Sequence, residues 1–180
     1  MAWRTVLEHT DRPAGLCLTR QNVPVFDRAA GNGRGLASAD AVARGGYILA
    51  DGAGGAPEVI LIATGSEVQI ALAARDLLQA AGTPVRVVSM PCVEWFAEQD
   101  AAYRERVLPP GIRARVCVEA GIALGWRALV GDSGECVSLE HFGASAAYQT
   151  LYEEFGLTAE RVAAAARSSL ARLSAVAASE

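Results

Sequence analysis

The feature that most constrains the fold is an almost unbroken apolar run at residues 58–63, followed at once by a turn. A strand with one face in water alternates apolar and polar residues, whereas a continuous run of this length is typical of a strand covered on both faces. Thr64-Gly65 ends this run, a helical pattern follows, and Gly82 ends the helix. A second strand-like run occupies residues 85–90. This order predicts parallel strands joined by a crossover helix.

The same alternation continues through the rest of the chain. Further strands are predicted at 47–49, 115–119 and 136–142, and further helices at 101–108, 122–130, 146–155 and 160–173. Strands that alternate with helices of about ten to fifteen residues favour a parallel sheet wrapped by helices. The predicted fold class is therefore α/β, with a three-layer, mainly parallel five-stranded sheet and helices on both of its faces.

The first 25 residues hold the strongest candidate for a binding residue. A helical stretch at 2–8 precedes a short apolar run at 16–18, which leads directly into Thr19-Arg20-Gln21-Asn22. We predict that this run is a buried strand and that Arg20 stands at its carboxyl end. Ligands collect at that end of strands in open α/β sheets, and a guanidinium there suits a phosphate or a carboxylate. A loop rich in glycine and asparagine follows at 27–35, and we place a domain boundary near residue 25.

Charge and composition argue against two classes of protein. The formal net charge is −4, and the 16 basic residues, all arginines, are scattered, so no basic stripe suggests nucleic-acid binding. No apolar run approaches the ~20 residues that a membrane span needs. The start of the chain lacks the apolar core of a secretory signal, so we expect a cytoplasmic protein. The four cysteines show neither a CxxC pair nor metal-ligand spacing and are expected to be buried structural thiols.

A turn between strand and helix is a weaker candidate for a binding site. The free backbone N–H groups of Thr64, Gly65 and Ser66 could hold an anion at the start of the helix. However, Ser66 is expected to cap these groups while Gln69 reaches back in a capping box. Glu67 also adds negative charge at this place. A plain helix cap is therefore the favoured interpretation, and an effector or anion site is the alternative.

Two residues, one at the end of the fourth strand and one after it, are candidates for an interface. Glu119 stands at the end of this strand and could pair with a partner, and Trp126 could pack beside it. A buried structural glutamate fits Glu119 equally well. Farther along the chain, Ser145 is a plausible N-cap, and His141 is expected to be structural.

A series of short stretches resembles the transketolase family. Each stretch alone is weak evidence, but their order and spacing cover the whole chain. The Thr19-Arg20-Gln21-Asn22 and Val107-Leu108-Pro109 pieces favour transketolase over related thiamine enzymes that share this domain shape, such as dehydrogenase beta subunits and deoxyxylulose phosphate synthase. The matching stretches are Thr19-Arg20-Gln21-Asn22, Ala43-Arg44-Gly45-Gly46-Tyr47, Ile62-Ala63-Thr64-Gly65-Ser66-Glu67-Val68, Arg86-Val87-Val88-Ser89-Met90-Pro91, Tyr103-Arg104, Val107-Leu108-Pro109, Val118-Glu119-Ala120-Gly121, Phe142-Gly143 and Glu153-Glu154-Phe155-Gly156-Leu157-Thr158.

The resemblance implies a domain organisation and an activity. Residues 1–24 would be the tail of a pyrimidine-binding domain, residues 25–44 a linker, and residues 45–180 the C-terminal domain. Transketolases move two-carbon ketol units between sugar phosphates, using thiamine diphosphate and a divalent metal such as Mg²⁺. The implied partners are the remaining transketolase domains, a second subunit of a homodimer and sugar phosphates, with no nucleic acid and no membrane.

The resemblance also assigns a role to Arg20. The arginine of this motif binds the phosphate of the sugar substrate in the family, whereas the alternative is that Arg20 pairs with a local carboxylate. Gln21 and Asn22 are expected to hold the turn through side-chain hydrogen bonds. The family's diphosphate site resembles a Gly-Asp-Gly sequence followed by an asparagine, and Gly131-Asp132-Ser133-Gly134 does not match it, because both asparagines of the chain come earlier. In the family, the glutamate that activates the aminopyrimidine and the catalytic histidines belong to segments upstream of Met1, so no catalytic residue is expected in this chain.

Two interpretations of the chain compete. In the first, it is part of a transketolase that contributes Arg20 and packing surfaces and is inactive alone; a split enzyme with the other domains on a separate chain is a variant. In the second, it is a stand-alone regulatory or small-anion-binding module that uses the turn at 64–67. For the segment up to about residue 24, we expect either disorder, contact with the C-terminal domain, or exchange with another copy.

Overall fold

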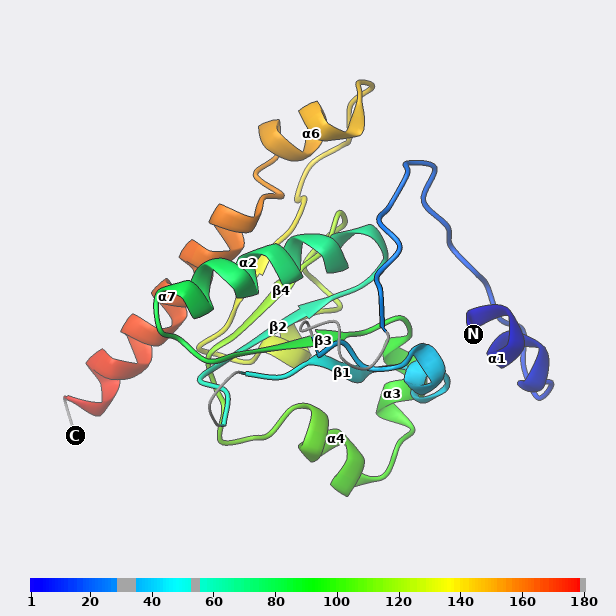
Figure 1. The fold of residues 1–180 in the computed structure, drawn as a ribbon, viewed down its shortest axis with the longest axis horizontal. Helices are drawn as coiled ribbons and strands as arrows, with labels where there is room; N and C mark the ends of the chain where they lie inside the picture. The colour runs from blue at the N-terminus through cyan, green and yellow to red at the C-terminus, as the bar shows by residue number, and fades with distance from the viewer. Residues whose placement is uncertain (29–34, 53–55, 179–180) are drawn as a thin grey trace.

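The computed structural model describes residues 1–28, 35–52 and 56–178, and a five-stranded sheet forms the centre of this part of the chain (Figure 1). The strand order is β1-β3-β2-β4-β5, with β1 antiparallel to β3 and the other three pairs parallel. The predicted mainly parallel, five-stranded α/β sheet is confirmed. The strands are β1 (Tyr47–Ala50), β2 (Val59–Ala63), β3 (Val85–Ser89), β4 (Arg115–Val118) and β5 (Glu135–Val137).

Helices cover both faces of the sheet. In Figure 1, α2 and α7 run along one face, while α3 and α4 lie on the other side of the strands. No helix within the described ranges is long and apolar enough to cross a membrane. The α-helices are α1 (Ala2–Glu8), α2 (Val68–Ala80), α3 (Val93–Ala97), α4 (Ala101–Val107), α5 (Arg127–Val130), α6 (Tyr148–Glu154) and α7 (Ala159–Ala177), and the 3₁₀ helices are η1 (Ala39–Arg44) and η2 (Gly65–Glu67).

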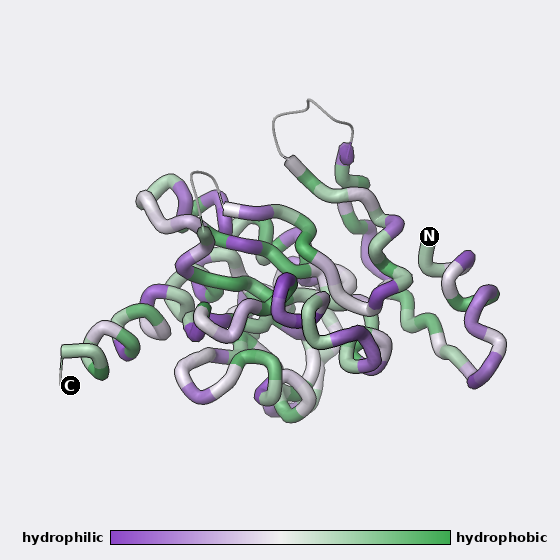
Figure 2. Tube along the Cα trace, turned by 90° about the horizontal axis from the view of Figure 1, so that it is seen from below, coloured by the Kyte–Doolittle hydropathy of each residue, from purple (hydrophilic) through white to green (hydrophobic). Residues whose placement is uncertain are grey.

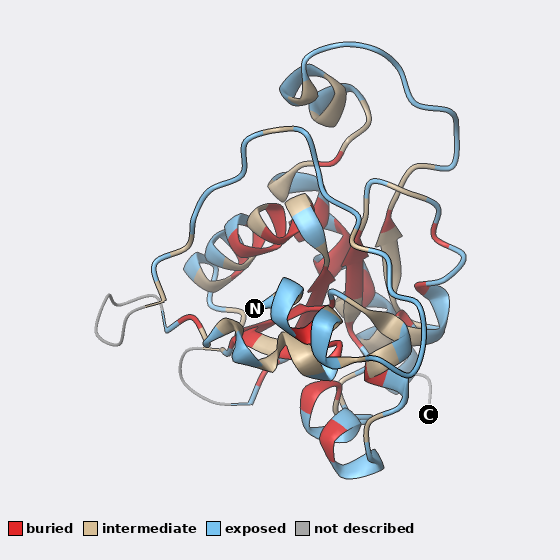
Figure 3. Cartoon of the chain, turned by 90° about the vertical axis from the view of Figure 1, so that its right-hand side faces the viewer, coloured by how far each residue is buried: buried red, intermediate tan, exposed pale blue. Residues whose placement is uncertain are grey.

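The apolar run that forms β2 is central to both layers of the core. All five of its residues are fully buried. Leu61 packs in a cluster with α2 and α7, whereas Ile60 and Ile62 pack in a second cluster with α3, α4 and α5. Successive side chains of a strand point to opposite faces, so a strand covered twice must be apolar at every position. Figures 2 and 3 show the hydrophobic and buried residues gathered in these strands.

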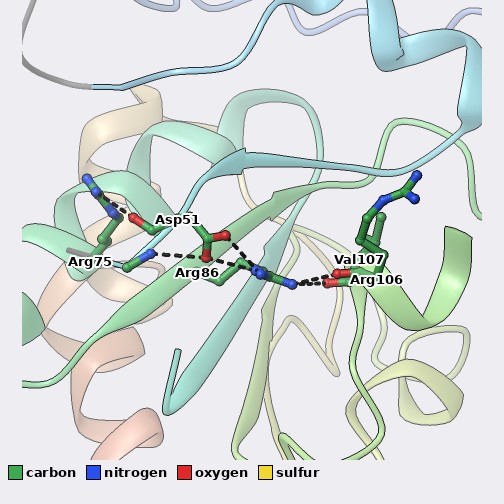
Figure 4. A network of polar contacts seen from close by, with 6 residues as sticks. Asp51, Arg75, Arg86, Arg106 and Val107 are labelled. Atoms are coloured by element: carbon green, nitrogen blue, oxygen red, sulfur yellow. Dashed lines mark hydrogen bonds and ion pairs between the residues drawn. The ribbon is translucent and has the colours of Figure 1, made fainter. Parts of the chain in front are cut away.

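A charged residue sits inside this sheet and joins three elements (Figure 4). Arg86 on β3 donates two hydrogen bonds to the carboxylate of Asp51, with distances of 3.0 and 2.8 Å from Nε and Nη2 to the carboxylate oxygens. Its Nη1 donates to the backbone carbonyls of Arg106 and Val107 at the end of α4. Arg75 on α2 donates to the Asp51 carbonyl. Arg86, a residue that is only 8% exposed, therefore has a partner for each nitrogen of its guanidinium, as burial of a charge requires.

The N-terminal segment departs from the prediction. The helix at 2–8 is confirmed as α1, but the predicted strand at 16–18 is wrong, because these residues have no regular structure and Leu18 is 71% exposed. A strand needs a neighbour to pair its backbone groups, and none of the five described strands pairs with this segment. Cys17 is accordingly exposed rather than buried.

Three predicted elements near the carboxyl edge of the sheet are shorter than expected. The helix predicted at 122–130 is reduced to α5, preceded by turns, and the strand predicted at 136–142 ends at Val137, which leaves Phe142 98% exposed. The last helix before α7 begins only at Tyr148, after Ala147, so the expected N-cap at Ser145 is wrong. In all three cases, loops occupy residues that the apolar pattern alone placed in regular structure. Of the glycine-rich loop predicted at 27–35, residues 29–34 lie outside the described ranges.

Candidate functional site

Arg20 lies in the irregular segment that leads away from α1. Its side chain is exposed, and it takes part in no ion pair between described residues. Pairing with a local carboxylate, the alternative raised by the sequence, is therefore absent from this part of the chain. An exposed guanidinium without a carboxylate partner keeps its donors available for an external anion.

The residue after Arg20 anchors this segment to the C-terminal part of the chain. Between residues 10 and 25, only Leu16 and Gln21 are partly buried, while all the others are exposed. The Gln21 amide nitrogen donates to the hydroxyl of Tyr152 on α6 at 3.0 Å. The Thr19 hydroxyl in turn donates to the Gln21 carbonyl oxygen. The expectation that Gln21 makes side-chain hydrogen bonds is confirmed, and one partner, Thr19, lies within the turn while the other lies 131 positions away along the chain.

Tyr152 connects this segment to the turn between β2 and α2. Its hydroxyl donates to Glu67 Oε1 at 2.5 Å and lies 3.1 Å from the hydroxyl of Ser66. Ser66 donates to the same carboxylate oxygen at 2.6 Å. Burial, followed by the hydrogen bond to Glu67, raises the pKa of Tyr152. The phenol thus remains a hydrogen-bond donor to a buried carboxylate.

These contacts correct the predicted capping box. Thr64 occupies the N-cap position of η2 without a side-chain cap, and the α2 helix that follows begins without one as well. The Ser66 hydroxyl is directed to Glu67 and Tyr152 instead of to the backbone. Gly65, with a φ of 53°, makes the turn in a backbone conformation that favours glycine. A buried carboxylate at this turn opposes the binding of an anion there.

A second carboxylate ends the neighbouring strand. Glu119 follows β4 directly, and burial raises its pKa to about 7, with a further contribution from the negative charge of Glu67. Gly121 lies close to this side chain, and a Cβ at that position would be in ordinary van der Waals contact with Glu119. Glu119 is half-buried, and its role, as a structural glutamate or as an interface residue, stays a prediction. Trp126 is only 8% exposed and packs in the second core cluster of the chain itself, which leaves little of it for an interface.

The segment before Arg20 also touches the C-terminal part of the chain. The ring of His9 stacks on Trp95 with ring centroids 4.2 Å apart, and Arg12 forms an ion pair with Glu98. Of the three fates expected for the N-terminal segment, these contacts correspond to contact with the C-terminal domain. A cavity of about 530 Å³ lies between the two parts and is lined on one side by α1 and residues 12–16 and on the other by residues of the β3–α3 turn.

The glycine-rich turn at 131–134 carries an ion pair in the structure. Asp132 in the glycine-rich turn is exposed, and its carboxylate is engaged by Arg113 Nη2 at 2.9 Å. This ion pair lowers the pKa of Asp132. No group of three or more His, Cys, Asp or Glu side chains in these ranges is placed to hold a metal ion. In the described part of the chain, the Asp132 carboxylate is therefore engaged by an arginine, and no cluster of acidic, histidine or cysteine side chains fits Mg²⁺.

The sequence patterns missed Tyr152. It lies in a predicted helix without a motif of its own, and only the folded chain brings it to Gln21 and Glu67. Arg20, Gln21 and the turn at 64–67 were found from the sequence, and the structure brings Gln21 and this turn together through Tyr152.

Comparisons with known proteins agree with this architecture. Residues 45–158 match the family model described as the transketolase-like TK C-terminal domain. The chain is 55% identical over 176 residues to the transketolase of Mycobacterium tuberculosis H37Rv, covering 94% of this chain and 24% of that protein. It therefore spans about a quarter of the length of this relative.

Solved structures point to the same family. The transketolase from Leishmania mexicana superposes with a TM-score of 0.69 and 37% identity, covering 77% of this chain and 20% of that one. A Pichia stipitis transketolase in complex with sedoheptulose 7-phosphate gives a TM-score of 0.61 and 33% identity, covering 71% of this chain and 18% of that one. The chain belongs to the transketolase family, and residues 45–158 form its C-terminal domain.

Proposed function

We propose that this chain is the C-terminal portion of an enzyme that transfers two-carbon ketol units between sugar phosphates. The observation that carries this proposal is the 55% identity to a transketolase over almost the whole chain. The chain contributes substrate binding and packing surfaces. Thiamine diphosphate and Mg²⁺ are bound by the remaining domains, and the isolated chain is inactive.

Arg20 binds the phosphate of the sugar substrate. It is exposed, has no carboxylate partner within the described ranges, and its neighbour Gln21 is attached to Tyr152 on α6. A bidentate guanidinium fixes the far end of a phosphorylated sugar, so that the reacting carbonyl is oriented toward the cofactor. The Pichia stipitis relative in complex with sedoheptulose 7-phosphate supports a sugar phosphate as the ligand class.

The packing surface lies at the carboxyl edge of the sheet. Ile122, Leu124 and Phe142 in the loops after β4 and β5 are 60%, 76% and 98% exposed. Apolar side chains gathered on a surface mark a contact with another domain or subunit. The remaining transketolase domains and the second subunit of a homodimer cover this edge. The domain boundaries near residues 24 and 44, and a cytoplasmic location, stay predictions.

The role of Arg20 is tested by the variant Arg20→Ala in the complete enzyme, in which this chain is joined to the remaining domains. The donors are xylulose 5-phosphate and xylulose, with unphosphorylated glyceraldehyde as acceptor, so that only one phosphate enters the assay. Loss of charge-assisted hydrogen bonds to a phosphate should lower kcat/KM for xylulose 5-phosphate by at least about tenfold. The kcat/KM for xylulose should be unchanged. An equal decrease of kcat/KM for both sugars would refute the phosphate role of Arg20.

A stand-alone anion-binding module is not favoured. The hydroxyl of Ser66 is used by Glu67 and Tyr152, and the Glu67 carboxylate occupies the turn that an anion would need. A split enzyme, with the remaining domains on a separate chain, uses the same residues in the same roles.

A further inference from the structure

The arginine proposed to bind the substrate is carried by a segment with few attachments to the rest of the chain. Of residues 17–25, all except Gln21 are exposed. A guanidinium on an unsupported segment would lose part of its binding free energy to the ordering of that segment. The question is therefore what holds Arg20 in place.

A chain of hydrogen bonds links the residues on either side of Arg20 to the sheet. The Thr19 hydroxyl donates to Gln21 Oε1, and Gln21 Nε2 donates to the Tyr152 hydroxyl at 3.0 Å. The Tyr152 hydroxyl donates its own proton to Glu67 at 2.5 Å. Each of these three donors has an acceptor, and the last acceptor is the carboxylate of Glu67, a residue that is only 4% exposed at the end of η2.

Tyr152 is the point where three parts of the chain meet. It belongs to α6, while Gln21 comes from the N-terminal segment and Glu67 from the turn after β2. Its ring packs edge-on against Tyr148, with centroids 5.8 Å apart. In Figure 1 the N-terminal segment rises toward the end of the molecule that carries α6.

We propose that Tyr152 is a positioning residue that orients Arg20 for the substrate phosphate through Gln21, anchored by Glu67. This inference rests on the proposed role of Arg20 and adds the residues that set its position. Tyr152 itself does not touch the substrate. Its contribution is to hold the backbone of residues 19–21, so that the guanidinium meets the phosphate without an ordering cost.

The test uses Tyr152→Phe and Gln21→Leu in the complete enzyme. The first removes one hydroxyl and keeps the ring; the second removes the amide from an exposed segment, where it does not threaten folding. KM for xylulose 5-phosphate should rise about three- to tenfold, the effect of one hydrogen bond, with kcat nearly unchanged. Xylulose should be used as well as by the unchanged enzyme. The matched control, Tyr148→Phe, removes a hydroxyl from the same helix and should leave both sugars unaffected.

The double variant Arg20→Ala with Tyr152→Phe separates positioning from general structure. If Tyr152 acts through Arg20, the double variant should use xylulose 5-phosphate no worse than Arg20→Ala alone. Losses that multiply, or a Tyr152→Phe effect that is equal for xylulose and xylulose 5-phosphate, would overturn the positioning role.

The outcomes also distinguish the two proposals. If Arg20→Ala discriminates between the two sugars while Tyr152→Phe and Gln21→Leu do not, only the positioning role fails. If Arg20→Ala itself shows no discrimination, the phosphate role fails, and the positioning role fails with it.

Discussion

Replacement of Glu119 by glutamine should stabilise the chain in a pH-dependent way. Burial raises the pKa of Glu119 from its ordinary 4.5 to about 7, and the charge of Glu67 contributes. At a pH between these two values, Glu119 carries a proton in the folded chain but has released it in the unfolded chain. Unfolding free energy therefore falls as the pH rises through this window, and above pH 7 the folded state bears the full cost of an ionised Glu119.

The size of this cost follows from the two pKa values. The difference between 4.5 and about 7, at about 1.4 kcal/mol for each pH unit, gives about 3 kcal/mol. Solvent reaches part of the side chain and screens its charge, so we expect between about 1 and 3 kcal/mol. Glutamine matches the shape of the protonated acid and cannot ionise. Glu119→Gln should therefore stabilise the chain by this amount at pH 8 and by less than about 1 kcal/mol at pH 5.

Urea unfolding followed by far-UV circular dichroism, from pH 5 to pH 8.5, measures this difference. Glu140→Gln is the matched control in the adjacent loop, because hydrogen bonds from the backbone of Ala123 and from Ser138 lower the pKa of Glu140. That variant should not gain stability at high pH. A gain for Glu119→Gln that is the same at pH 5 and pH 8, or no gain at either, would refute the argument from buried charge.

Two further changes test the packing of the chain. The planar guanidinium of Arg115 donates to four backbone carbonyls around the start of β4, and a lysine ammonium cannot reach all four. Arg115→Lys should therefore lower the unfolding free energy by about 1–3 kcal/mol, as measured by urea unfolding. An unchanged midpoint of unfolding would contradict this role. A thiol reagent should modify Cys17 first and Cys117 last, because Cys17 is exposed while Cys117 is buried and burial raises the pKa of its thiol. Mass spectrometry of the labelled peptides gives the order of modification. Early labelling of Cys117 would contradict the packing.

The sheet could be predicted from the sequence because each strand is marked by the apolar pattern of its own residues. The run that forms β2 is apolar at every position, and such a pattern fits a strand buried on both faces. The helix at α4 was placed within one residue, and its N-cap Asp100 accepts a hydrogen bond from the Tyr103 N–H. Where the pattern was apolar but no neighbouring strand or layer was available, as at residues 16–18 and at Phe142, the prediction failed.

The candidate site could be predicted only in part. Arg20 and the turn at 64–67 follow from motifs and from their position after strands. The link between them depends on Tyr152, which approaches from α6 late in the chain. Ser66 looked like a cap because its spacing to Gln69 matches a capping box. In the structure, the Ser66 hydroxyl instead donates to the buried carboxylate of Glu67, the next residue. A hydrogen bond to a charged acceptor is stronger than one to a neutral group.

The central proposal is that this chain is a necessary part of a transketolase and has no ketol-transfer activity by itself. The most direct measurement is a coupled ketol-transfer assay with xylulose 5-phosphate, thiamine diphosphate and Mg²⁺, on the purified chain alone and joined to the upstream domains of the Mycobacterium tuberculosis relative. Activity only in the combined protein is the predicted result. Activity of the chain alone, or a well-folded combined protein without activity, would contradict the account.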